Sequence, residues 1–374
     1  MDILISGILS VTFKQFFMWG VGGLLIYLAI KKQYEPALLL PMGFGAILVN
    51  FPMTGVLTQT IGGTEVEGIL DFLFNGGIAT ELFPLLIFIG IGAMIDFGPL
   101  LQNPFMLLFG AAAQFGIFFT ICVATLFGGF DIREAASIGI IGAADGPTSI
   151  FVTSQLAYHL LGPVTIAAYS YMALVPIIQP LAIKMVTTKA ERQIRMTYKA
   201  ESISKTTKIL FPIVITIIAG LIAPVSLPLI GFLMFGNLLR ECTVLDRLSS
   251  AAQNELVNIV TILLGITIAT KMTADEFLQM DTLLIISFGL VAFVFDTIGG
   301  VLFAKLINLF RKEKFNPMIG AAGISAFPMS ARVIQKMAQK EDPQNFVLMY
   351  AVGANVAGQI ASVIAGGLIL AYFA

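Results

Sequence analysis

Charged residues and metal-ligating residues are scarce in this chain of 374 residues. Charged residues make up 11% of it, and His159 is the only histidine. This argues against a histidine-rich metal site or a haem site. The two cysteines, Cys122 and Cys242, lie in unrelated segments without metal-ligand spacing, so we expect them to be core residues. The formal net charge of -1 argues against a nucleic-acid partner.

The chain also lacks the motifs of the common soluble enzymes. It contains no Walker A loop, no dinucleotide-binding fingerprint after a strand and no GxSxG elbow. Any energy that the protein uses must therefore come from an ion gradient or from a reaction supplied by another subunit.

Apolar residues are abundant instead, at 57% of the chain. Apolar runs long enough to span a bilayer recur along nearly its whole length. We predict an all-α polytopic protein of the inner (cytoplasmic) membrane with about eleven transmembrane helices. The candidate spans are 14–31, 36–51, 82–97, 104–127, 133–157, 164–185, 207–224, 252–271, 282–305, 316–336 and 344–372.

Two loops carry opposite charge signals. The segment 185–208 has six basic residues against two acidic ones, so we expect it to be cytoplasmic. The segment 52–81 has four acidic residues and no basic one, which suggests the outside. Eleven crossings place both segments on the same side. Either one segment does not cross or one charge signal misleads, and the basic signal carries more weight.

The stretch Gly142-Ala-Ala-Asp-Gly-Pro-Thr-Ser149 interrupts one of the apolar runs. It places a carboxylate, a Gly-Pro break and two hydroxyls at membrane depth. A charged side chain there costs about 2.5–3.5 kcal/mol, and the break frees carbonyls that hydrocarbon cannot satisfy. We therefore expect this stretch to hold an ion or a proton.

Asp145 is the candidate sodium or proton ligand within this stretch. Hard cations take oxygen ligands, which Asp145, Thr148, Ser149 and the freed carbonyls offer. The alternative is a neutral, hydrogen-bonded aspartic acid in a helix kink.

The chain contains an internal repeat. Residues 142–148 are echoed by Gly320-Ala-Ala-Gly-Ile-Ser-Ala326, and the surrounding segments follow in the same order. We predict two inverted five-helix repeats with broken helices, a design typical of ion-coupled transport. The alternative is chance similarity between two Gly/Ala-rich helices. The predicted divisions are an N-terminal membrane helix (1–35), the first repeat (36–185), a basic loop (186–206) and the second repeat (207–374).

Other polar residues at membrane depth have a structural and a functional interpretation. Arg332 could anchor an anionic substrate or extend to the interface. Asn355 and Gln359 offer amide oxygens on one helix face, although helix packing explains the small residues around them equally. Tyr171 could donate a proton or be interfacial. Asp296 is a further, weaker intramembrane candidate.

Together these residues resemble a known family. The strings are Gly142-Ala-Ala-Asp145-Gly-Pro-Thr148, Tyr171, Asn316-Pro-Met-Ile-Gly320, Gly323-Ile-Ser325-Ala-Phe-Pro-Met-Ser-Ala-Arg332 and Gly353-Ala-Asn355-Val-Ala-Gly358. They resemble the membrane beta subunit of sodium-pumping, biotin-dependent decarboxylases, which act on oxaloacetate, methylmalonyl-CoA, glutaconyl-CoA or malonate. The resemblance covers essentially the whole chain.

The resemblance implies a membrane subunit that decarboxylates carboxybiotin, exports sodium and consumes a proton. The carboxybiotin would not be bound covalently to this chain. It would arrive on a biotin carrier subunit, loaded by a carboxyltransferase alpha subunit, with a small gamma or delta subunit in the membrane and three copies of this chain forming a trimer.

The resemblance also implies roles for individual residues. Sodium would be held by Asp145, Thr148, Asn355 and Ser325. Carboxybiotin would be bound by Arg332, Asn316 and Gly320. The catalytic residues would be Arg332, Tyr171 and Ser325, with Arg332 positioning the carboxybiotin carboxylate and Tyr171 or Ser325 relaying the proton.

Two other function classes remain open. Five-plus-five inverted repeats with broken helices also occur in sodium-coupled secondary transporters of organic anions. A passive membrane anchor for soluble subunits is the third possibility, but it does not explain Asp145 or the repeat.

Overall fold

The computed structural model describes residues 7, 9–52, 54–197 and 202–373. This part of the chain is α-helical apart from one antiparallel pair of strands, β1 (Gln59–Ile61) and β2 (Thr64–Val66). The predicted all-α class is therefore confirmed.

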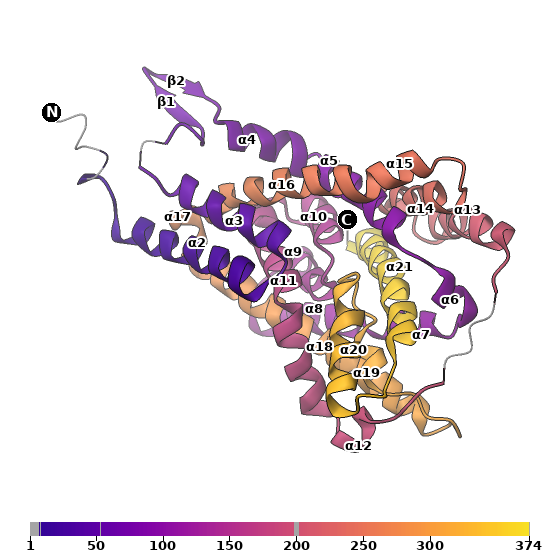
Figure 1. Ribbon diagram of the computed structural model, residues 1–374. Coiled ribbons are helices and arrows are strands. Elements are labelled where there is room, and N and C mark those ends of the chain that lie inside the picture. The colour runs from indigo at the N-terminus through magenta and orange to yellow at the C-terminus, as the bar shows by residue number, and fades with distance from the viewer. Residues whose placement is uncertain (1–6, 8, 53, 198–201, 374) are drawn as a thin grey trace.

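The helices form two layers (Figure 1). The first layer contains α2 (Phe13–Lys32), α3 (Pro36–Val49), α4 (Ile69–Leu73), α5 (Leu82–Met94), α13 (Lys205–Ile222), α14 (Leu227–Glu241), α15 (Asp246–Ala251) and α16 (Val257–Ile268). The second contains α7 (Met106–Ala112), α8 (Phe115–Phe127), α9 (Ile132–Gly139), α10 (Gly146–Leu156), α11 (Leu161–Val186), α18 (Met280–Asn308), α19 (Met318–Ala321), α20 (Met329–Glu341) and α21 (Leu348–Phe373). Short helices connect them: α6 (Gly98–Gln102), α12 (Lys189–Arg192) and α17 (Ala274–Phe277).

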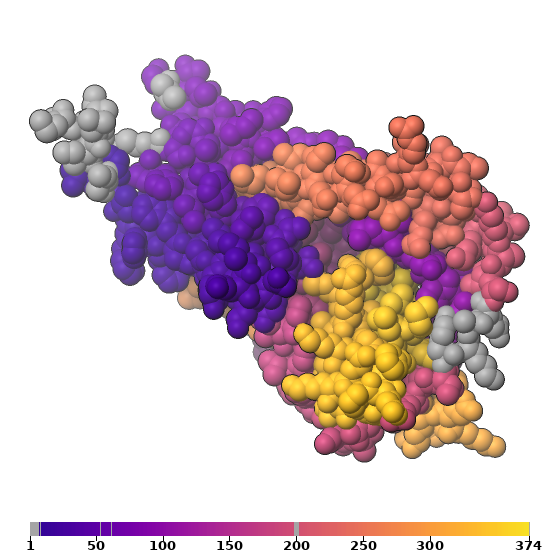
Figure 2. Space-filling model, in the orientation of Figure 1, coloured from indigo at the N-terminus to yellow at the C-terminus, as the bar shows by residue number. Residues whose placement is uncertain are grey.

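Each half of the chain contributes to both layers. Figure 2 shows the indigo N-terminal helices and the orange α15–α16 segment beside each other, bordering the yellow C-terminal helices. Contacts recur between the halves: α3 packs on α16 as α14 packs on α5, and α10 packs on α21 as α20 packs on α11. One π-helical turn interrupts each half of the first layer, at Phe74–Ile78 and Ala252–Leu256. This pattern is typical of a repeat, and the predicted boundaries at 36–185 and 207–374 stay a prediction.

The predicted number of eleven crossings is not confirmed. In the described chain, seven helices are long and apolar enough to cross a membrane. The number is eight if the bent pair Ile69–Ile78 and Leu82–Met94, which meet at 59°, forms one span.

The candidate span 133–157 turns back on itself. Glu134 lies in the first turn of α9, and His159 follows the end of α10, yet their side chains are 2.9 Å apart. Both ends of the segment therefore lie at the same end of the molecule. We name residues 132–156 the first hairpin; they enter the membrane region and return instead of crossing it.

The candidate span 316–336 turns back in the same way. Asn316 precedes α19 and Asn345 follows α20, and the side-chain amides of both donate to the backbone carbonyls of Arg192 and Ile194 at 2.8–3.3 Å. We name residues 316–341 the second hairpin. Its two ends are tied to one short piece of backbone.

The two hairpins enter from opposite ends of the molecule. Helix α11 starts beside His159 and ends at Val186, close to Arg192. Its 26 residues span about 39 Å, more than the hydrocarbon thickness of about 30 Å. The bases of the hairpins are therefore separated by the full membrane.

This arrangement resolves the conflict between the charged loops. Glu65 and Asp71 share a cavity of about 570 Å³ with His159, so the acidic segment lies at the base of the first hairpin. The basic segment lies at the base of the second, three crossings later. The two charge signals conflicted because the segment 133–157 was expected to cross the membrane, and it does not. The positive-inside rule predicts that the basic end is cytoplasmic, and this orientation stays a prediction.

The expectation that both cysteines are core residues is wrong. Cys122 is exposed on α8, and Cys242 is only partly buried, with its thiol 3.2 Å from the carbonyl oxygen of Leu239. Cys122 shares its helix with the exposed Phe115 and Phe118, a surface that suits lipid. A membrane-facing side chain needs only to be apolar, so an apolar sequence position does not show burial.

Candidate functional site

The tips of the two hairpins meet in the interior of the second layer. The backbone N–H of Ser325 donates to the carbonyl of Ala143 at 2.9 Å, and its hydroxyl donates to the same oxygen at 2.7 Å. The arm Ile132–Ala143 is about 18 Å long, and α20 is about 20 Å long. Their sum matches the length of α11, which places the contact near the middle of the membrane.

The break in the first hairpin positions Asp145. A short 3-10 turn, Ile140–Ala143, ends at Ala144, whose φ of 53° lies in the left-handed region. This conformation costs a non-glycine residue roughly 1–2 kcal/mol, and such strain collects at functional sites. The chain direction changes there, and Asp145 becomes the N-cap of α10, followed by Pro147 in the first turn.

The carboxylate of Asp145 is buried and surrounded by hydroxyls. The Thr148 hydroxyl donates to Oδ2 at 2.8 Å, and the Ser362 hydroxyl donates to the same oxygen at 2.8 Å. The Thr148 backbone N–H donates to Oδ1 at 3.3 Å. Ser149 does not touch the carboxylate; its hydroxyl donates to the Asp145 carbonyl at 2.8 Å.

One face of α21 closes the site. Asn355, Gln359 and Ser362 follow the helical spacing that aligns side chains on one side. The Asn355 amide donates to the Ile324 carbonyl at 2.7 Å, and the Gln359 amide donates to the Ser325 carbonyl. Asn355 was predicted as a ligand from the sequence. Ser362, which lies two turns further along the same face, was not.

Several buried oxygens in this region have no hydrogen-bond partner in the described chain. They are Asn355 Oδ1, Gln359 Oε1 and the Tyr169 hydroxyl, whose ring lies against Gly146. Buried acceptors are normally satisfied, so unpaired oxygens beside a carboxylate are a place for a cation. The described residues contain no group of three or more His, Cys, Asp or Glu side chains that could hold a metal ion. The donor set therefore suits a hard monovalent cation held by carboxylate, hydroxyl and amide oxygens.

Tyr171 and Arg332 lie away from these bonds. The Tyr171 hydroxyl donates to the carbonyl of Ile286 on α18. Arg332 is exposed on α20, and its charge acts on Glu35 at the start of α3. Burial raises the pKa of the Glu35 carboxyl, and Arg332 opposes this shift. Arg332 is thus an accessible positive charge on the arm that leads to the cytoplasmic end.

Asn316 and Gly320 hold the second hairpin in place. The Asn316 carboxamide is fully used: its nitrogen bonds to the Arg192 and Ile194 carbonyls, and its oxygen accepts from the Met318 N–H at 3.1 Å. A Cβ on Gly320 would lie 2.0 Å from the Gly300 carbonyl oxygen, so α19 and α18 touch through their backbones. The structure does not bring either residue to Asp145.

Gln179 of α11 supports the same hairpin and was missed from the sequence. Its amide donates to the Ala321 carbonyl at 2.8 Å and to the Ser330 hydroxyl at 2.7 Å. In the sequence, Gln179 is marked only as a polar residue within an otherwise apolar helix.

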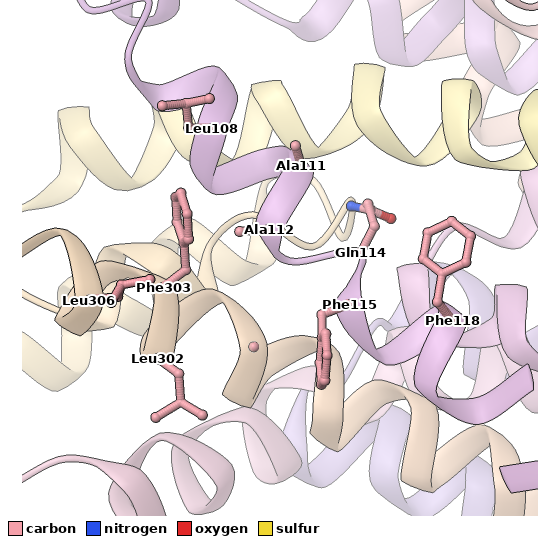
Figure 3. A pocket seen from close by; sticks show the side chains of 10 residues that line it. Leu108, Ala111, Ala112, Gln114, Phe115, Phe118, Leu302, Phe303 and Leu306 are labelled. Atoms are coloured by element: carbon pink, nitrogen blue, oxygen red, sulfur yellow. The ribbon is translucent and has the colours of Figure 1, made fainter. Parts of the chain in front are cut away.

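A further cavity lies elsewhere, away from Asp145. It has a volume of about 780 Å³ between α7–α8 and α18, and Gln114 is its only hydrogen-bonding side chain. Figure 3 shows Gln114 at the bend between α7 and α8, with aromatic and aliphatic side chains around the groove. Phe115, Phe118, Leu302 and Leu306 are exposed there, so this groove faces lipid and is not an ion site.

The sequence matches the family described as Na+-transporting oxaloacetate decarboxylase beta subunit over residues 14–373. This chain belongs to that family. It is 49% identical to the methylmalonyl-CoA decarboxylase subunit beta of Propionigenium modestum, over 98% of this chain and 97% of the relative. It is 50% identical to the glutaconyl-CoA decarboxylase subunit beta of Acidaminococcus fermentans, over 98% and 95%. The oxaloacetate decarboxylase beta chain of Haemophilus ducreyi is 44% identical, over 98% and 96%.

Membership in this beta-subunit family confirms the resemblance seen in the sequence. The chain is an integral membrane subunit of a sodium-transporting decarboxylase and one part of a multi-subunit enzyme. In this beta subunit, the contact between the hairpin tips lies beside the buried Asp145 carboxylate and its hydroxyl partners.

Proposed function

We propose that this beta subunit removes the carboxyl group from carboxybiotin and uses the reaction to export sodium. The observation that carries this proposal is the cluster around Asp145, where the tips of two opposed hairpins meet one face of α21: a buried carboxylate, two hydroxyl donors and unpaired amide oxygens of α21. Asp145 would be the main ligand of a sodium ion bound there, with Thr148, Ser325 and Asn355 as further ligands.

The chemical step is a decarboxylation. The bond between the biotin ring nitrogen and the carboxyl carbon breaks, CO2 leaves, and the electron pair stays on the nitrogen, which takes up one proton. The reaction is favourable, so the protein must delay it until sodium is bound. Sodium and a proton compete for one carboxylate, because a nearby cation favours its ionised form. That competition would couple the two events.

Arg332 is the proposed anchor for the carboxylate of carboxybiotin. It is exposed on the arm that leads from the cytoplasmic end to the hairpin tips, where a bound anion would lie on the path to Asp145. A guanidinium binds carboxylates through two parallel hydrogen bonds. Tyr171 or Ser325 would deliver the proton, and the Ser325 hydroxyl donates to the Ala143 carbonyl, two residues before Asp145.

Asn316 and Gly320 would act through the second hairpin. Their bonds and packing fix the position of this hairpin, and with it Ser325 and Arg332. They are therefore positioning residues in this proposal, and their direct contact with carboxybiotin stays a prediction.

The remaining parts of the enzyme are proposed from the family. A carboxyltransferase alpha subunit would load biotin on a carrier subunit, the carrier would dock at the basic end of this chain, and a small gamma or delta subunit would complete the membrane part. A homotrimer of the beta subunit is proposed on the same basis.

The test is CO2 release from free carboxybiotin by the purified membrane part, titrated with sodium. We expect sodium to stimulate release and Asp145→Asn to abolish the stimulation. Asp275→Asn is the matched control, because the Asp275 side chain is 91% exposed and forms an ion pair with the exposed Lys14, at 3.7 Å. Loss of stimulation in both variants would contradict a specific role for Asp145.

The competing function is a sodium-coupled secondary transporter of an organic anion. It predicts that the protein binds sodium and releases no CO2 from carboxybiotin at any sodium concentration. Full sodium-stimulated turnover of an Arg332→Ala variant would show that the reaction does not need Arg332. That result would leave the proposed sodium site unaffected.

A further inference from the structure

A second carboxyl group is buried at membrane depth, on the other side of the first hairpin. Asp296 of α18 is completely buried. Its Oδ1 accepts the backbone N–H of Ile117 at 3.1 Å, and the N–H of Gly116 also donates to the carboxyl. Its Oδ2 has no partner among the described residues.

Two glycines leave the space that this carboxyl occupies. A Cβ on Gly142 would lie 2.6 Å from Asp296 Oδ2, and a Cβ on Gly116 would lie 2.6 Å from Oδ1. Gly142 is three residues before Asp145, in the inward arm of the first hairpin. The unpaired oxygen of Asp296 therefore faces the first hairpin, while the paired oxygen is bonded to α8.

Among the residues that the structure describes, none forms an ion pair with Asp296. Helices α7, α8 and α19 and the turn Ile140–Ala143 contain no charged residue. On α18 the other charged residues are Asp281 and Lys305, near its two ends, and Lys305 pairs with Glu191 at 2.9 Å. The titratable residues of α9 are Arg133 and Glu134, of which Glu134 pairs with His159. Those of α11 are Tyr169, Tyr171 and Lys184, of which Tyr171 donates to Ile286.

We propose that Asp296 is a proton-binding site, distinct from the sodium site, which holds a proton while the first hairpin lies against it. An ionised carboxylate with one bare oxygen in an apolar, water-free setting is unstable, and a bound proton removes the charge. A sodium ion would need several more oxygens, and none of the described contacts of Asp296 provides them. The proton is exchanged when Gly142 moves away and water reaches Oδ2.

The simpler explanation is that Asp296 only caps α8. Its position suits a cap, since a carboxylate near a helix N-terminus accepts the free N–H groups and interacts favourably with the helix dipole. A cap alone requires only one acceptor oxygen, whether the carboxyl is ionised or neutral. It leaves the bare Oδ2 and its glycine-lined contact with the first hairpin without an explanation.

Infrared spectroscopy of the purified protein near neutral pH tests the protonation directly. A protonated carboxyl group gives a C=O stretching band apart from that of a carboxylate, and the band shifts in D2O. We expect Asp296→Asn to remove one such band, and the control Asp281→Asn, an exposed residue of the same helix, to leave it unchanged. Asparagine keeps an acceptor for the Ile117 N–H and has nearly the same size.

A second variant keeps the test decisive if Asp296→Asn is unstable. Asp145→Asn leaves Asp296 intact, so the band should persist in it. A band that disappears in Asp145→Asn, or that persists in a folded Asp296→Asn protein, would overturn the proposal and leave Asp296 an ionised cap.

The use of this proton in pumping rests on the proposed function and has a separate readout. We expect Asp296→Asn to slow sodium-stimulated CO2 release about 10²-fold, the size of a lost positioned proton group, with sodium affinity unchanged. Full turnover with the infrared band lost would confirm the proton site and reject its role in the pump. A loss of sodium binding would instead show that Asp296 belongs to the sodium site, against the proposal.

Discussion

The bases of the two hairpins are closed by different kinds of bonds. At the cytoplasmic end, residues 192–197 form a strap across the second hairpin. The amides of Asn316 and Asn345 bind its carbonyls, and Arg192 pairs with Glu341 at 2.8 Å with both side chains mostly buried. At the other end, the first hairpin is closed by His159 and Glu134 at 2.9 Å, and the His159 side chain is 65% exposed.

The difference indicates which hairpin opens more easily. Buried amide–carbonyl bonds are costly to break because they leave unsatisfied carbonyls, whereas an exposed ion pair contributes about 0–1 kcal/mol. We infer that the second hairpin is the fixed side of the site and the first hairpin the movable side. The first hairpin carries Asp145 and contacts Asp296 of α18 through Gly142, so both groups with a proposed change of charge lie in or against the movable side.

The largest expected effect comes from glycine substitutions at corresponding places. Gly320→Ala would push a Cβ into the Gly300 carbonyl oxygen at 2.0 Å, and both partners are backbone. We expect a loss of about 3 kcal/mol in the free energy of unfolding. Gly142→Ala meets the side chains of Asp296 and Ala292 first, at 2.6 and 2.8 Å, and should cost less. Thermal unfolding in detergent ranks the two, and the reverse order would contradict a rigid second hairpin.

The next prediction breaks one base at a time. Asn316→Ala removes three hydrogen bonds of a fully buried side chain, and we expect it to cost about 2 kcal/mol. His159→Ala removes one exposed contact and should cost less than about 1 kcal/mol. Hydrogen exchange at each base measures both. Equal effects would mean that the two bases are equally strong, which would contradict the inference that the first hairpin opens more easily.

The smallest effect concerns the pH dependence of the strap. The hydrogen bonds from Arg195, at 2.6 and 3.1 Å, lower the pKa of the Asp342 carboxyl below its ordinary value of 3.8. A carboxyl with a lowered pKa stabilises the fold above its ordinary value, and this contribution disappears as the pH falls through the lowered pKa. Below pH 4, the melting temperature should therefore fall more steeply with decreasing pH in the original protein than in Arg195→Gln. Identical curves would show that this ion pair does not hold the strap.

The sequence predicted the chemistry of the site better than its surroundings. The sequence itself reveals the break at Gly142–Ser149, the carboxylate of Asp145 and the similar stretch at 320–326. These features stand out because polar residues and Gly-Pro are costly at membrane depth. The two echoed stretches indeed meet, through Ala143 and Ser325. Ser362 and Gln179 were not assigned, because nothing local distinguishes a polar residue that reaches the site from one that supports packing.

The amino-acid sequence by itself determined that this protein is helical, lies in a membrane and carries an oxygen-rich break at Asp145. Composition and hydropathy decide those features, because hydrocarbon rejects unpaired polar groups wherever they occur along the chain. Only the tertiary structure decided that two apolar segments turn back instead of crossing. That outcome depends on Glu134 meeting His159 and on Asn316 and Asn345 meeting one strap, contacts between residues 25 to 153 positions apart. Hydropathy sums neighbours along the chain and contains no information about such distant pairs.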